Sequence, residues 1–84
     1  NAEVRLWGQL HGVEKIEHEQ NRLRIQVKDA SRLNHDKLVS WLCEQETPLS
    51  YIPENTLDYK NVPPEMNAIL KSLKNLEQVF TVYG

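Results

Sequence analysis

The stretch from Leu10 to Val27 constrains the fold more than any other part of the chain. It reads LHGVEKIEHEQNRLRIQV, and it predicts a helix that ends at Gly12, followed by two strands that fold back on each other. Glycine suits the position after a helix because it adopts positive φ without a steric cost. The first strand is expected over Val13 to His18. The second has the period-two alternation of a half-buried strand, with Leu23, Ile25 and Val27 alternating with Arg22, Arg24 and Gln26.

A polar turn, Glu19-Gln20-Asn21, is predicted between these strands, with Asn21 suited to the left-handed conformation. Before the hairpin, an apolar stripe at helical spacing predicts a first helix over about Glu3 to His11. We interpret Trp7 on this stripe as a core anchor, because aromatic side chains supply much of the burial in small cores. The alternative is an exposed docking residue.

A second helix is expected to begin after Asn34, whose side chain can cap the first turn. Leu33 and Leu38 flank that cap at the spacing of a hydrophobic staple. The helix should stop near Glu46, because the residue before Pro48 is pushed out of helical geometry.

The second half of the chain predicts another hairpin and a last helix. Strands are expected over Leu49 to Ile52 and Thr56 to Lys60, joined by the turn Pro53-Glu54-Asn55. Pro63 and Pro64 should open the last helix, since a proline in the first turn loses no needed hydrogen bond. Apolar residues at spacings of three and four continue that helix to Phe80, and residues 81–84 are expected to fray.

These elements predict one α+β domain over residues 1–84, with the order α-β-β-α-β-β-α. Sequential strands usually pair, so two hairpins should form a small, mostly antiparallel sheet packed against three helices. A chain of 84 residues permits one small domain. We interpret Asn1-Ala2 as a remnant of tag cleavage, a hypothesis that a native reading frame would test.

Composition narrows the possible partners. The formal net charge of −2 gives no general attraction to phosphate, which weakens a nucleic-acid function without excluding a local basic patch. The single cysteine, Cys43, cannot form an internal disulfide, and we expect it to be a small buried residue. No apolar run approaches the roughly 20 residues that cross a bilayer. The sequence therefore predicts a cytoplasmic setting without a membrane partner.

No residue pattern predicts catalysis. The histidines, His11, His18 and His35, are too scattered for zinc-ligand spacing. No glycine is followed by the Lys-Ser/Thr pair of a phosphate-binding loop. We interpret the acidic residues of the first strand as a solvated face rather than an acid–base pair. No catalytic residue, metal or cofactor is therefore expected in this chain.

Arg22, Arg24 and Lys28 form a weakly basic stripe on the outer face of the second strand. Without aromatic neighbours on which bases could stack, this pattern is more typical of a solvated face or a salt-bridging docking surface than of a nucleic-acid platform. These three residues are the candidate docking face.

Four segments, AEVRLWGQLHGVEKIE, NRLRIQV, LNHDKLVSWLCEQ and LSYIPENTLDYK, resemble the C-terminal domain of the bacterial transcription-repair coupling factor. The resemblance runs from Ala2 to about Phe80 and lies in the order and spacing of elements rather than in a catalytic signature. In that family a helical stretch with a Phe-Gly-Pro-Leu-Pro-like segment precedes this region. The sequence contains none of that stretch, so family residues that contact partners from it have no counterpart here. The last helix is also less acidic than the family pattern.

The resemblance implies a non-catalytic regulatory domain of an ATP-dependent DNA translocase that displaces stalled RNA polymerase and recruits nucleotide-excision repair. ATP would bind in the motor upstream. The terminal domain would dock on the module of the same protein that recruits the damage-recognition ATPase, and repress the whole until polymerase is engaged. Its direct partners would be other domains of the same protein, with RNA polymerase, that ATPase and duplex DNA reached indirectly.

Two other functions remain open on the sequence. One is a free-standing nucleic-acid-binding α/β module, which an affinity for duplex DNA that falls steeply with salt would favour. The other is a small hydrolase of the acylphosphatase kind, which would need a phosphate-cradling loop that the sequence does not offer.

Overall fold

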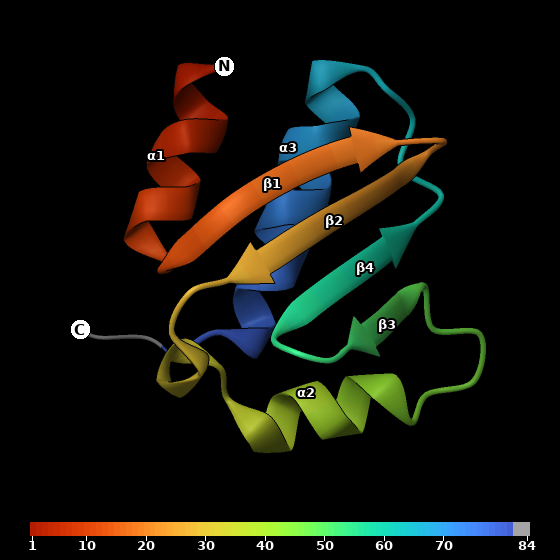
Figure 1. Ribbon diagram of the computed structural model, residues 1–84. Coiled ribbons are helices and arrows are strands. Elements are labelled where there is room, and N and C mark those ends of the chain that lie inside the picture. The colour runs from red at the N-terminus through yellow and green to blue at the C-terminus, as the bar shows by residue number, and fades with distance from the viewer. Residues whose placement is uncertain (82–84) are drawn as a thin grey trace.

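The computed structural model describes residues 1–81, and within them the chain forms three α-helices and four strands (Figure 1). In chain order these are α1 (Ala2–Leu10), β1 (Val13–Glu19), β2 (Arg22–Val27), α2 (His35–Leu42), β3 (Leu49–Ile52), β4 (Thr56–Lys60) and α3 (Met66–Leu76). Short 3₁₀ turns cover Ala30–Arg32 and Glu77–Val79. The predicted α+β class and the order α-β-β-α-β-β-α are confirmed.

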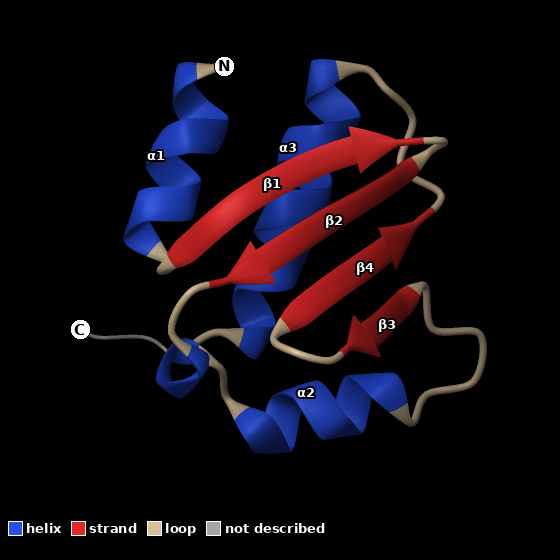
Figure 2. Ribbon diagram, in the orientation of Figure 1, coloured by secondary structure: helices blue, strands red, loops and turns tan. Residues whose placement is uncertain are grey.

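The four strands form one antiparallel sheet in the order β1-β2-β4-β3. Each predicted hairpin forms, and the two hairpins join because β2 pairs with β4, placing Ile25 opposite Leu57. In Figure 2, α3 passes behind the sheet, while α1 flanks the β1 edge and α2 flanks the β3 edge. The front face of the sheet carries no helix within the described part of the chain.

The core lies between the back of the sheet and α3. Leu23, Ile25 and Leu57 from the two central strands are fully buried, as is Leu76 of α3. The period-two pattern of β2 produces this arrangement, because every second side chain points to the same face. Trp7 of α1 is also buried in this cluster, which confirms it as a core anchor.

The hairpin turn between β1 and β2 has positive φ at both central residues, with 52° at Gln20 and 60° at Asn21. This is the signature of a type I′ turn, whose twist matches that of the flanking strands. Asn55 in the second hairpin also has a positive φ, of 57°. Asparagine tolerates this conformation better than most residues, so the two predicted asparagine turn positions are confirmed.

Gly12 has a φ of 65°, as its predicted place after the first helix requires. Its carbonyl accepts a hydrogen bond from the Lys28 amide at 2.9 Å, tying the end of α1 to the end of β2. A Cβ atom at this position would lie 3.2 Å from Cγ of Arg32. Both the backbone conformation and the available space therefore favour glycine here.

Replacing Gly12 by Val should lower the free energy of unfolding by about 1–3 kcal/mol, because a β-branched residue resists positive φ. Chemical denaturation of the chain measures this loss. Gly12→Asn is the matched control and should lose less, since asparagine tolerates this conformation. A Val variant as stable as the wild type would show that the left-handed conformation is not needed at this junction.

Two expectations about the second helix are wrong. The helix ends at Leu42 rather than near Glu46, and Glu46 itself has a φ of 60°. After Leu42 come the exposed Cys43 and four polar residues before Pro48, so no buried apolar contact extends the helix. Cys43 caps this earlier end and is exposed instead of buried.

The last helix is shorter than predicted at both ends. It begins at Met66 with Glu65 as its cap, so Pro63 and Pro64 precede the helix instead of opening it. It ends at Leu76, and Phe80 then forms a bridge with Leu33 that helical geometry would not allow.

Phe80 leaves the helix because its ring packs edge-on against Trp7 at a centroid distance of 5.6 Å. Thr81, expected to fray, donates a backbone hydrogen bond to the Arg32 carbonyl at 2.6 Å. The prediction that residues 82–84 also fray concerns residues that the structure does not describe.

Candidate docking face on the open side of the sheet

The uncovered side of the sheet, here called the open face, is built by the residues that alternate with the core positions. Because Leu23 and Ile25 point into the core, their neighbours on β2 point outward, and the register carries this alternation to the other strands. The open face consists of Lys15, Glu17, Glu19, Arg22, Arg24, Gln26, Thr56, Asp58, Lys60, Ser50 and Ile52.

Charges of opposite sign lie across from one another on this face. Glu17 and Glu19 of β1 are opposite Arg24 and Arg22 of β2, respectively. On its other side Arg24 is opposite Asp58 of β4. Such cross-strand pairs stabilise a sheet modestly, by about 0.2–1 kcal/mol each. The pairing of the strands therefore gives this face charges of both signs, so it is not uniformly basic.

Asp58 is the exception among these exposed residues, because its side chain is only 3% exposed. One carboxylate oxygen, Oδ2, lies 3.3 Å from Nη1 of Arg22 and 3.9 Å from Nη2 of Arg24. The two arginine side chains are about half exposed, at 50% and 52%, so they cover the carboxylate while keeping part of their surface in water. A buried carboxylate needs such partners, since desolvating an unpaired charge is costly.

The Lys15 ammonium group donates to the Glu17 carboxylate at 2.9 Å on the outer row of β1. This hydrogen bond lowers the pKa of Glu17 below its ordinary value of 4.5 and raises the pKa of Lys15 above 10.5. The carboxylate's contribution is therefore present above pH 4.5 and is lost as the pH falls through the lowered pKa. Both side chains are well exposed, so water screens the pair and it adds little stability.

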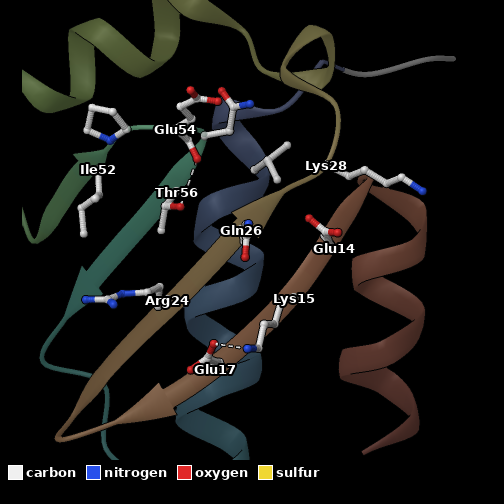
Figure 3. Close-up of a pocket in the computed structure, with 12 residues that line it drawn as sticks. Glu14, Lys15, Glu17, Arg24, Gln26, Lys28, Ile52, Glu54 and Thr56 are labelled. Carbon is white, nitrogen blue, oxygen red and sulfur yellow. Dashed lines mark hydrogen bonds and ion pairs between the residues drawn. The ribbon is translucent and has the colours of Figure 1, made fainter.

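A hollow of about 620 Å³ lies at the end of the open face nearest the β3–β4 turn (Figure 3). Its charged lining is balanced, with carboxylates from Glu14, Glu17 and Glu54 and cations from Lys15, Arg24 and Lys28. Its hydroxyl side chain, Thr56, donates to the Glu54 carbonyl at 3.2 Å, with no histidine in the lining to act as a base. The hollow therefore presents charged groups of both signs and polar side chains to a bound molecule.

The structure separates the three residues of the predicted stripe. Arg22 and Arg24 lie side by side on the open face, as the alternation predicts. Lys28 follows the end of β2 and borders the hollow together with Arg24. Arg22 is absent from that lining and borders a smaller hollow of about 120 Å³, which Arg24 also lines.

Sequence reasoning missed Asp58 and Lys60, which complete the charged centre of the open face. The alternation in Thr56–Lys60 carries the signal, because Leu57 and Tyr59 point inward and so place Asp58 and Lys60 outward. Which strand they would face could not be read locally, since the pairing of β2 with β4 joins segments far apart in the chain.

Two of the histidines have structural hydrogen bonds. His18 Nε2 lies 2.6 Å from the Val62 carbonyl, and His11 Nδ1 lies 2.9 Å from the Trp7 carbonyl. Among residues 1–81, no group of three or more His, Cys, Asp or Glu side chains is placed to hold a metal ion. Within the same residues, no helix has the length and apolar character needed to cross a bilayer.

Fold and face together define a small α+β domain with one uncovered, charged sheet surface. Comparison with protein-family models, curated proteins and solved structures gives no match. The function is therefore inferred from this surface and from the resemblance seen in the sequence.

Proposed function

We propose that this chain is a non-catalytic regulatory domain of an ATP-dependent DNA translocase that couples transcription arrest to nucleotide-excision repair. In this role it restrains the translocase by docking on another domain of the same protein. The resemblance to the C-terminal domain of the bacterial transcription-repair coupling factor supplies the parent protein. The translocase would work in the cytoplasm and would supply the contacts with RNA polymerase, the damage-recognition ATPase and duplex DNA.

The open face is the observation that carries this proposal. One whole side of the sheet is left without a helix in the described residues, and its exposed side chains are mostly charged. Interfaces that open and close are more polar than permanent ones, because each side must also be stable in water. A charged sheet surface without a nucleophile–base pair fits reversible docking better than catalysis.

The free energy of docking that is needed to restrain the translocase is small. Coupling between sites is usually worth about 1–3 kcal/mol, which a few ion pairs and their buried surroundings can provide. Contacts of this kind weaken with ionic strength, because salt screens exposed charges. Restraint by the open face should therefore be strongest at low salt and should be relieved when a competing partner engages the protein.

Deleting residues 3–84 from the full translocase tests the restraining role. Basal ATPase activity without RNA polymerase should rise, because the motor loses its restraint. Adding the 84-residue chain back in trans should lower the rate again. If deletion instead abolishes ATP hydrolysis while the remaining protein stays folded, the domain belongs to the motor. The upstream reading frame is a simpler check, since it should encode helicase motifs with a phosphate-loop lysine.

A further inference from the structure

Asp58 is a buried acid at the centre of the open face, and its charge is only partly satisfied. Oδ2 is shared between Arg22 and Arg24 at 3.3 and 3.9 Å. Oδ1 is buried and has no hydrogen-bond partner. A buried carboxylate held this loosely attracts both guanidinium groups without using all of their donors, since each arginine has five.

We infer that Asp58 is an internal counter-ion with which an acidic, extended partner segment competes for Arg22 and Arg24. The inference rests on the proposed docking function and names the chemistry of the docking partner. When the partner carboxylates leave, Asp58 again offsets part of the positive charge of the two arginines. Such a counter-ion makes docking weaker and more easily reversed than two unopposed arginines would.

The spacing of Arg22 and Arg24 indicates which backbone conformation and which charge spacing the partner segment should have. Arg22 and Arg24 are two residues apart on one strand, so their Cα atoms are about 6.6–6.8 Å apart. Carboxylates at alternate residues of an extended segment repeat at the same distance. Lys60 lies opposite Arg22 on β4 and adds a third cation beside the pair. A Glu-x-Glu pattern in an extended segment therefore matches this row.

A nucleic acid fits the same face less well. Glu17 and Glu19 border the arginines on the β1 side and would repel a continuous line of phosphates. The outward residues of the sheet also carry no aromatic ring within residues 1–81, so bases have nothing on which to stack. Two separate carboxylates bring less negative charge next to Glu17 and Glu19 than a continuous line of phosphates does.

The test measures binding of a fluorescent peptide of alternating Glu and Ser to the 84-residue chain by anisotropy at low salt. Asp58→Asn keeps the shape of the side chain but removes its charge. We expect it to tighten binding by about tenfold, since one negative charge is lost beside the two partner carboxylates. Arg22→Glu with Arg24→Glu should abolish binding. Lys71→Glu with Lys74→Glu changes the net charge equally on α3 and should leave binding close to that of the wild type.

Asp58→Thr serves as a second neutral variant, and circular dichroism checks that each variant is folded. Binding that is unchanged or weaker in folded neutral variants would overturn the inference and make Asp58 a residue that positions the arginines. Tighter binding of duplex DNA than of the acidic peptide would overturn it in favour of a nucleic-acid partner. The readout needs no translocase, so peptide binding tightened by Asp58→Asn would stand even if the restraining role failed.

Discussion

Replacing Leu23 by Ala should lower the free energy of unfolding by about 2–5 kcal/mol, through lost burial and a residual cavity. Leu23 is fully buried on β2, a central strand with a neighbour on each side. Leu73→Ala should cost a similar amount, because Leu73 of α3 is also fully buried in the core. Denaturation midpoints in guanidinium chloride measure both losses.

Leu6→Ala is the matched control for these two variants. Leu6 lies on α1 and is 57% exposed, so its truncation should change stability by well under about 1 kcal/mol. If the midpoints of the Leu23 and Leu73 variants barely move, the inner face of the sheet and the buried face of α3 are wrongly assigned. A large loss in the Leu6 variant would show that α1 is packed differently.

Trp7→Ala should cost about 3–5 kcal/mol, in the range of the largest core truncations. The Trp7 ring stacks on His11 at a centroid distance of 4.5 Å and meets Phe80 edge-on. Its Nε1 group donates to Oε1 of Glu77 at 3.1 Å, joining α1 to a segment 70 residues away. Domains of this size have about 5–15 kcal/mol of stability in total, so this variant should be close to unfolding at moderate temperature.

Trp7→Phe separates packing from the hydrogen bond. It keeps an aromatic ring in the core but removes the donor to Glu77, so it should lose less stability than Trp7→Ala. Thermal unfolding followed by circular dichroism ranks the variants. Equal stability of Trp7→Ala and the wild type would contradict the role of Trp7 as the link between α1 and the end of the chain.

Local patterns were enough to predict most of the elements. Both strands of the second hairpin have the predicted bounds, and the Asn34 side chain accepts from the Lys37 amide at 3.1 Å, as its cap position implied. These features depend on side chains and backbone a few residues apart. The alternation in β2 likewise placed Arg22 and Arg24 on the outer face correctly.

Features set by distant contacts could not be predicted in the same way. Phe80 continues the helical spacing of α3, but its contact with Trp7 draws it out of the helix. The burial of Asp58 follows from the pairing of β2 with β4, which brings two arginines over it. The positive charge of the open face was therefore overestimated from β2 alone, because its counter-ions come from β1 and β4.

The most direct test of the proposed docking through the open face is the basal ATPase activity of the proposed full-length translocase carrying Arg22→Glu and Arg24→Glu. Lys71→Glu with Lys74→Glu is the matched control, since it makes the same charge change on α3. We predict that the arginine variant raises the polymerase-independent rate about fivefold or more, that the increase shrinks at high salt, and that the control behaves as wild type. A rate that stays at the wild-type value in the arginine variant, while deletion of residues 3–84 raises it, would contradict docking through this face.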